Sequence, residues 1–374
     1  MPSSTSSSKG AETAQDRVPN GPWLKTWAVA FAIMAILLGG MEIFWRARGF
    51  QPSVKDNAEL WSQWRSKLDM KGENSVVLIG SSRTQVGVNP RVLAQSLGDA
   101  VVVQLAIDGS SPIPVLQDLA EDQSFGGVVI CEVAPTMFFG LARDSESKPS
   151  EWLRRHRGRS LISAWEVPAR AAIESHCVVF LPQLSPAHLL ESLLHGELPG
   201  PHYVRMEPDR LKVADFSTVD RARVLEKWRL RFTAMGQTPT AAELRRRLAS
   251  IDACVRSIQR RGGEVVFLHM VSSDAVREVE ERRFPRHDYW DVFARSTSGV
   301  AIHYADVPSL SAFICGDGSH LDGIQAQSFS KALAAEMSRL DLSPQARANK
   351  AGPQDSHRHA RQQQAVSNLA VDAW

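Results

Sequence analysis

The chain of 374 residues is 43% hydrophobic and 22% charged, and its formal net charge is +2. This composition is too apolar for a chain that is disordered throughout and too polar for a protein with many membrane spans. Four cysteines are too few for a disulfide scaffold, and the near-neutral charge gives no global argument for nucleic-acid binding.

The N-terminal part of the chain predicts a membrane anchor. Residues 1–22 are polar and rich in serine, and we expect them to be disordered. The apolar run from Trp27 to Trp45 has 19 residues, and as a helix it would span about 28 Å, close to one hydrocarbon core. We therefore expect a transmembrane helix within residues 23–48. A cleaved signal peptide and a buried core helix remain as alternatives, and equal numbers of basic residues on the two sides leave the orientation open.

Five short apolar runs rich in β-branched residues predict strands. They are continuous rather than alternating, which suits strands that are buried on both faces of a parallel sheet. Helical patterns separate them, including one that opens with Thr240 and Glu243 in capping-box spacing. This alternation predicts a three-layer α/β/α sandwich whose five-stranded parallel sheet has the flavodoxin-like order 2-1-3-4-5. The runs are 75–80, 100–106, 127–134, 264–270 and 300–306.

The spacing of the runs predicts a large insertion. About 130 residues separate the third run from the fourth, whereas one crossover needs only about a dozen. We expect residues 136–239 to form a mostly helical insertion in an α/β domain of residues 55–341, followed by a disordered tail, 342–374. Between Arg205 and Arg261 there are 14 Lys or Arg residues and 7 Asp or Glu residues. This excess suits a solvated helix face, with anionic lipid headgroups or an acidic polymer as alternatives.

Candidate catalytic residues follow the ends of the predicted strands, where open parallel sheets bind ligands. Ser82, after the first run, is the candidate nucleophile. His320 would accept its proton and Asp317 would orient the imidazole. The N–H groups of Ser82 and Gly109 are candidate oxyanion donors, and Arg83 is a candidate substrate-binding residue. Gly-Ser-Ser after a strand also fits a tight turn or an anion-binding turn, and Asp-x-x-His occurs by chance in many proteins. The signal is therefore the joint placement of the two motifs.

The layout of these motifs resembles the SGNH (GDSL-like) hydrolase superfamily, which has Gly-Asp-Ser after its first strand and Asp-x-x-His before its last helix. Residues 80–82 (Gly-Ser-Ser) and 317–320 (Asp-Gly-Ser-His) correspond to these blocks, and Gly109 matches the block-two glycine. The resemblance covers about residues 75–340, without the insertion. The Gly-Ser-Ser variant is similar to the membrane-anchored branch, which includes the D-alanyl-lipoteichoic acid transfer protein and proteins of cell-surface polysaccharide gene clusters.

The third block departs from the family. The family usually carries Gly-x-Asn-Asp there, and its Asn supplies a third oxyanion donor, whereas this chain has Glu-Val-Ala-Pro from Glu132 to Pro135. An ionised carboxylate cannot stabilise an oxyanion. Either two donors suffice, or the insertion supplies another, or the site is weak, and we expect slow hydrolysis in water.

The resemblance implies a membrane-anchored acyl-ester hydrolase or O-acyltransferase that acts on a cell-envelope or exported polysaccharide, with its catalytic domain on the periplasmic or extracytoplasmic side. One alternative is a non-catalytic glycan-binding or assembly subunit, docked to a membrane-bound acyl-transfer or export partner. Another is an intracellular lipase acting on bilayer lipid. We expect no cofactor, metal or nucleic-acid partner, because the chain lacks a Walker A loop, a GxGxxG motif, typical zinc spacing and basic stretches interleaved with aromatics.

Two further features have open interpretations. Residues 282–291 form a polar and aromatic patch, which suits either an acceptor groove or the salt-bridged start of a helix. His269, at the end of the fourth run, is more typical of a hydrogen-bonded core histidine than of a ligand.

Overall fold

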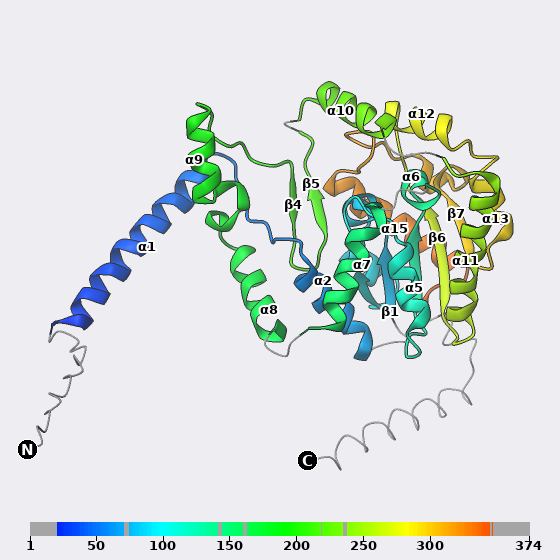
Figure 1. Ribbon diagram of the computed structural model, residues 1–374, viewed down its shortest axis with the longest axis horizontal. Helices are drawn as coiled ribbons and strands as arrows, with labels where there is room; N and C mark the ends of the chain where they lie inside the picture. Colours follow the sequence, from blue (N-terminus) through cyan, green and yellow to red (C-terminus); the bar gives the residue numbers. More distant parts are fainter. Residues whose placement is uncertain are drawn as a thin grey trace, which may run out of the picture.

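The computed structural model describes residues 21–70, 75–140, 144–159, 163–217, 219–234, 238–344 and 346. The two segments that the sequence predicts to be disordered lie almost entirely outside these residues. Within the described ranges the protein is a mixed α/β structure built around one five-stranded parallel sheet (Figure 1).

The strands of the central sheet run in the order β2-β1-β3-β6-β7, and all neighbouring pairs are parallel. Each strand lies inside one of the five predicted runs, so the predicted parallel sheet is confirmed. Continuous β-branched residues locate such strands because both faces are buried. The strands are β1 (Ser75–Ile79), β2 (Val101–Gln104), β3 (Val128–Glu132), β6 (Glu264–His269) and β7 (Val300–His303).

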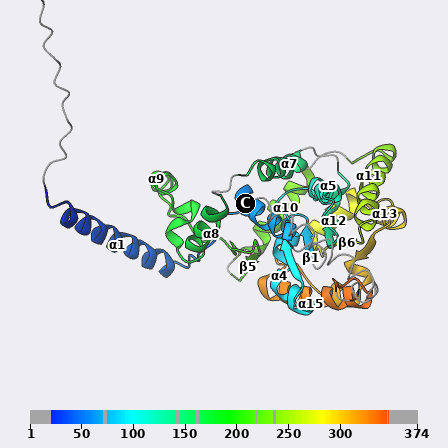
Figure 2. The same ribbon diagram turned by 90° about the horizontal axis from the view of Figure 1, so that it is seen from below.

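Each face of the sheet carries its own hydrophobic core, because successive side chains of a strand point to opposite faces. Val77 and Ile79 pack in one core with α5 and α11, and Val76 and Leu78 pack in the other with α4 and α15. Figure 2 shows α5 and α11 on one side of the sheet and α4 and α15 on the other. These helices are α4 (Pro90–Ser96), α5 (Ile113–Glu121), α11 (Ala241–Gln259) and α15 (Gly323–Arg339).

The predicted capping box is present at the start of α11. The Thr240 side chain accepts a hydrogen bond from the Glu243 N–H, and the Glu243 carboxylate accepts one from the Thr240 N–H. Asp322 caps α15 in a similar way, by accepting from the N–H groups of Ile324 and Gln325. These caps satisfy N–H groups that a helix terminus leaves without an internal partner.

Helix α1 (Trp23–Ala47) has 25 residues and projects away from the sheet (Figure 1). It is long and apolar enough to cross a membrane, and Trp45 is its one buried residue. Its C-terminal turns are fixed to a later segment of the chain. The Glu42 carboxylate accepts hydrogen bonds from the N–H groups of Val178 and Val179.

Between β3 and β6, the described residues form helices and one antiparallel hairpin, β4-β5. The hairpin is an addition to the mostly helical insertion that the sequence predicts, because strands of three residues carry too little periodicity to be recognised. The elements here are α6 (Pro135–Phe138), α7 (Asp144–Arg157), α8 (Ser163–Glu174), η3 (Val178–Phe180), η4 (Pro182–Leu184), α9 (Pro186–Leu194), β4 (Val204–Met206), β5 (Lys212–Ala214) and α10 (Arg221–Ala234).

The remaining elements precede the sheet, join its strands or follow its last strand. Those before β2 are α2 (Ala58–Arg65), η1 (Ser66–Met70) and α3 (Ser82–Gly87). Those after β6 are α12 (Asp274–Arg283), α13 (Trp290–Ser296), η5 (Tyr304–Asp306) and α14 (Pro308–Ser311).

Candidate active site

Ser82 is presented by a sharp turn at the carboxyl end of β1. The strand ends at Ile79, two residues form the turn, and α3 begins at Ser82 itself. A glycine is needed at position 80, because a Cβ there would collide with the Glu132 carboxylate and the Thr84 hydroxyl. The turn is therefore packed directly against the end of the neighbouring strand β3.

Glu132 organises this turn from the last position of β3. Its Oε2 accepts hydrogen bonds from the Ser81 N–H at 2.7 Å and from the Thr84 hydroxyl at 2.6 Å. Its Oε1 accepts from the Ser81 hydroxyl at 2.8 Å. The residue is 1% exposed, so these contacts compensate for the burial of its polar atoms. A Glu in a buried strand is itself a signal of a fixed polar contact, because a buried carboxylate requires hydrogen-bond donors.

The structure brings Ser82, His320 and Asp317 together. The distance from Ser82 Oγ to His320 Nε2 is 2.8 Å, and that from His320 Nδ1 to Asp317 Oδ2 is 2.7 Å. If Nδ1 carries the proton and donates to Asp317, Nε2 is left as an acceptor for the Ser82 hydroxyl. The Oδ1 atom of Asp317 accepts from the N–H groups of Ser319 and His320, which fixes the carboxylate in the turn before α15.

The environment of Asp317 keeps its carboxylate ionised. Burial acts to raise the pKa of this group. The hydrogen bond and charge of His320, together with the two backbone N–H groups, outweigh burial and lower the pKa below its ordinary value. An ionised Asp317 holds the imidazole tautomer that leaves Nε2 facing Ser82 and stabilises the imidazolium when a proton arrives.

Trp228 on α10 completes the contacts of the Asp–His pair. Its Nε1–H donates to Asp317 Oδ2 at 3.2 Å, and its ring lies 5.6 Å from the His320 ring, centroid to centroid. Sequence reasoning missed this residue, because α10 precedes the last motif by almost ninety positions and carries no motif of its own.

The predicted oxyanion donors lie in the loops that follow β1 and β2. The Ile107 N–H donates to Gly80 O at 2.9 Å, which ties the two loops together. Gly109 has a φ of +66° in a tight turn that the Ser110 N–H closes on Ile107 O. Among the hydrogen bonds of the described residues, none uses the N–H of Ser82 or that of Gly109. Both groups are therefore available to a ligand.

Arg83 takes a different position from the substrate-binding one that the sequence predicts. Its guanidinium forms a buried ion pair with Glu280, in which Nη2 lies 2.7 Å from Oε1, and its Nε donates to the Ser319 hydroxyl at 3.0 Å. Burial acts to lower the pKa of Arg83, but the Glu280 charge outweighs it and raises the pKa. The side chain points inward toward Glu280, since a buried cation is stable only with a charged partner. It thus braces the loop of Asp317 and His320 instead of facing a substrate.

The hairpin β4-β5 lines one side of the candidate site. Lys212 on β5 donates to the Asp108 carboxylate at 2.8 Å, in the turn that contains Gly109. Burial, together with the charges of Asp317 and Asp108, raises the pKa of Tyr203, which directly precedes β4. The segment between β3 and β6 therefore contacts the loop that carries Gly109, through Lys212, and the loop that carries Asp317, through Trp228.

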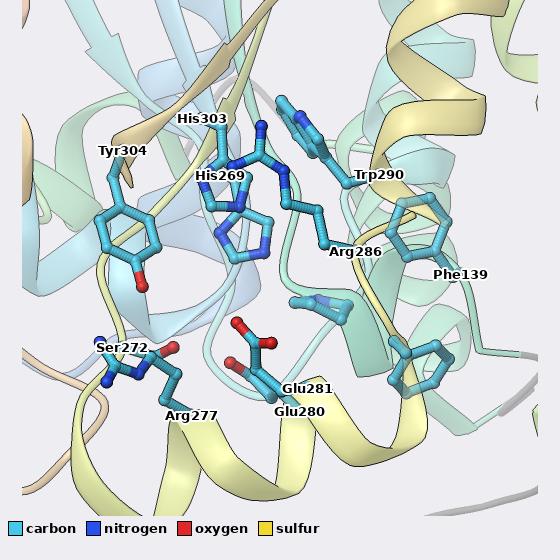
Figure 3. A pocket seen from close by; sticks show the side chains of 12 residues that line it. Phe139, His269, Ser272, Arg277, Glu280, Glu281, Arg286, Trp290, His303 and Tyr304 are labelled. Atoms are coloured by element: carbon cyan, nitrogen blue, oxygen red, sulfur yellow. The ribbon is translucent and has the colours of Figure 1, made fainter. Parts of the chain in front are cut away.

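A separate pocket lies at the ends of β6 and β7 (Figure 3). The rings of His269 and His303 stack there with their centroids 4.3 Å apart, and Trp290 lies edge-on to both. The accessible volume is about 20 Å³, close to that of one water, and Ser82 and His320 are not among the lining residues. Arg286 of the lining is paired with Asp291 and Asp306. The polar and aromatic patch is thus an ion-paired cluster, the second of its two interpretations.

The arrangement around Ser82 contains the groups that acyl transfer through a serine ester requires: a nucleophile, an oriented base and two available N–H donors. Within the described part of the chain, no group of three or more His, Cys, Asp or Glu side chains is placed to hold a metal ion.

No family model matches the sequence, and a search of curated proteins found no match. The geometry of the site therefore carries the functional conclusion.

Proposed function

We propose that this protein is a membrane-anchored, SGNH-like serine enzyme that transfers or hydrolyses acyl esters on a cell-envelope or exported polysaccharide. The observation that carries the proposal is the continuous hydrogen-bonded chain from Ser82 Oγ through His320 to the buried Asp317. A hydrogen-bonded Ser, His and Asp with both contacts below 3 Å is the geometry of an activated hydroxyl nucleophile.

The proposal includes a three-layer α/β/α sandwich with the flavodoxin-like strand order. The order β2-β1-β3-β6-β7 and the separate cores on the two faces support it. It also includes α1 as the anchor, with the sheet domain on the periplasmic or extracytoplasmic side. The length and apolar composition of α1 support the anchor.

In the proposed reaction, Ser82 Oγ attacks the ester carbonyl carbon while its proton passes to His320 Nε2. The oxyanion accepts hydrogen bonds from the N–H groups of Ser82 and Gly109. The intermediate collapses when His320 returns the proton to the departing alcohol, which leaves the acyl group as an ester on Ser82. A sugar hydroxyl or water then attacks this ester and gives its proton to His320. The bond between the acyl group and Ser82 Oγ breaks as His320 passes the proton to Oγ, which restores the serine hydroxyl and leaves the acyl group on the acceptor.

Glu132 bears on the choice between transfer and hydrolysis. Its carboxylate is occupied by the turn before Ser82, so the site offers two oxyanion donors where the family offers three. Loss of one such donor typically lowers the rate by about 10²–10³. A bound sugar hydroxyl can offset this loss through positioning, which water cannot. The proposal therefore favours transfer to a sugar over fast hydrolysis.

A fluorophosphonate probe tests the nucleophile directly. We expect wild-type protein to be labelled and Ser82→Ala to remain unlabelled. Ser311→Ala, at an exposed serine on α14, is the matched control and should label like wild type.

A folded protein that takes up no probe but still binds glycan would contradict the catalytic proposal. It would favour the second candidate, a glycan-binding subunit of a polysaccharide assembly or export system. The observation in favour of that candidate is the occupied carboxylate of Glu132, which stands where the family has an oxyanion donor.

A further inference from the structure

An apolar surface lies next to the C-terminal end of α1. It consists of five side chains on η3, on α9 and just after α9, and we call it the α9 surface: Phe180, Leu190, Leu193, Leu194 and Leu198. Leu190, Leu193 and Leu194 are 60%, 63% and 79% exposed, and no residue of α9 is buried. Residues at this spacing lie on one face of a helix, so the exposed leucines form a continuous stripe. An exposed apolar patch of this kind marks a contact surface.

The α9 surface is fixed in position relative to α1. Trp45 and Phe50, at the end of α1 and just after it, pack against Val178, Leu181 and Leu184 of the two short helices that lead into α9. The Arg46 guanidinium also donates to His176 O at 2.7 Å. In Figure 1, α9 lies next to the C-terminal end of α1, and the hairpin β4-β5 lies between α9 and the sheet.

The dimensions of α1 place the α9 surface at the level of a membrane interface. The 25 residues of α1 are about 37 Å long, slightly more than a hydrocarbon core of about 30 Å. The turn of α1 that holds η3 and η4 therefore lies where the bilayer meets water. A helix at this depth buries its apolar face about 5–10 Å into the boundary between headgroups and acyl chains.

We infer that the α9 surface is a second membrane contact, inserted into the lipid interface beside α1. The inference rests on the proposed anchoring role of α1. The occupant is lipid because the surface is continuous with the segment that packs on the end of α1. One transmembrane helix alone leaves a domain free to rotate about its axis, and a second contact fixes the height and direction of the Ser82 site above the bilayer.

The composition of α9 sets the kind of lipid contact. Glu191 is its one acidic residue, and it carries no Lys or Arg. Burial of apolar area, and not attraction to anionic headgroups, therefore drives the contact. The contact should form on zwitterionic lipid and should be insensitive to salt, unlike an interaction through the Arg-rich helices α10 and α11.

The test places an environment-sensitive fluorophore at Leu193→Cys in the full chain, with Cys177→Ser and Cys254→Ser removing the two partly exposed native thiols. The protein is reconstituted in phosphatidylcholine vesicles that contain spin-labelled lipid. Ala335→Cys, an exposed position on α15, is the matched control. We expect blue-shifted emission at position 193 and about threefold or more stronger quenching than at position 335, unchanged by high salt.

A third probe, at Leu37→Cys in the middle of α1, separates two kinds of failure. Quenching at position 37 without quenching at position 193 would overturn the inference and leave the anchor intact. No quenching at either position would instead contradict the anchor in the proposed function. Shielding of position 193 in native membranes but not in pure lipid vesicles would identify a protein occupant and would also overturn the inference.

Discussion

The carboxylate of Glu132 holds the backbone N–H of Ser81 at 2.7 Å, one residue before the candidate nucleophile. This contact joins the end of β3 to the turn after β1. The same carboxylate oxygen also accepts a hydrogen bond from the Thr84 hydroxyl. Glu132, which departs from the motif of the proposed SGNH-like family, is thus the residue that shapes the turn presenting Ser82. A carboxylate used in this way gives no donor to an oxyanion, which is why we expect transfer to exceed hydrolysis.

Glu132→Gln should weaken the turn before Ser82. The amide nitrogen that replaces one oxygen is a donor. The side chain therefore loses either the hydrogen bonds that Oε2 accepts from the Ser81 N–H and the Thr84 hydroxyl, or the one that Oε1 accepts from the Ser81 hydroxyl. A buried hydrogen-bonding group left without its partner costs about 1–3 kcal/mol of stability. Thermal unfolding and the rate of fluorophosphonate labelling should both report the loss. Glu278→Gln, at an exposed position on α12, is the control. Unchanged unfolding and labelling in Glu132→Gln would contradict the role given to this carboxylate.

Ester turnover should depend on a sugar acceptor. With an activated acetyl ester alone, we expect slow release of the alcohol, because two oxyanion donors in place of three lower the rate by about 10²–10³. Addition of candidate polysaccharide should increase release and yield acetylated glycan. Both activities should vanish in Ser82→Ala and in His320→Ala. Fast hydrolysis that polysaccharide does not change would indicate a plain esterase instead.

Trp228→Phe should lower turnover while leaving the fold intact. The phenyl ring keeps the packing against His320 but lacks the N–H that donates to Asp317 Oδ2. A hydrogen bond to a charged group contributes about 1.5–3 kcal/mol, so we expect a loss of about tenfold or more in kcat with little change in KM. Trp165→Phe, at a residue that is 84% exposed, is the control. Wild-type kcat in Trp228→Phe would show that the ring acts through packing alone.

The stacked histidines of the separate pocket should make the protein sensitive to mild acid. Burial lowers the pKa of His269 and of His303 to about 3, with the charge of Arg83 adding to the effect on His269 and the neighbouring His269 adding to that on His303. In the unfolded chain these groups titrate near 6.5, so below that pH the unfolded state binds more protons. The stabilising contribution is complete above pH 7 and is lost as the pH falls toward 3.

Each histidine should lower the free energy of unfolding by about 2 kcal/mol when the pH is lowered from 7 to 5. Denaturant titration of the detergent-solubilised protein at the two pH values measures this loss. The double variant His269→Gln/His303→Gln should show a smaller difference between the two pH values than wild type. An equal difference in wild type and variant would show that other groups dominate the acid sensitivity.

The proposed orientation can be tested with reporter fusions at the C-terminus. Alkaline phosphatase folds in an oxidising compartment, so a fusion after Trp374 should be active if the sheet domain lies outside the cytoplasm. A reporter that works only in the cytoplasm should be silent at the same position. The reverse pattern would place the domain in the cytoplasm and favour the alternative of a lipase that acts on bilayer lipid.

Much of the site can be predicted from the sequence, because local patterns locate the strands and the parallel topology brings their carboxyl ends to one edge. Continuous β-branched runs locate buried strands, and the carboxyl ends of parallel strands share one edge of the sheet. Ser82 follows one strand and His320 follows another. Their proximity can therefore be predicted from the parallel topology alone, without knowledge of side-chain contacts. Asp317 lies three residues before His320, within reach in a single turn.

Only the tertiary structure decided which groups surround these residues. Arg83 pairs with Glu280 across 197 positions, and Trp228 reaches Asp317 across 89. No periodicity or motif encodes such pairings. They depend on how helices from distant parts of the chain pack over the sheet, and on the need of each buried charge or donor for a partner. The same need gives Glu132 its role: a carboxylate that cannot reach water must find its hydrogen bonds inside the fold.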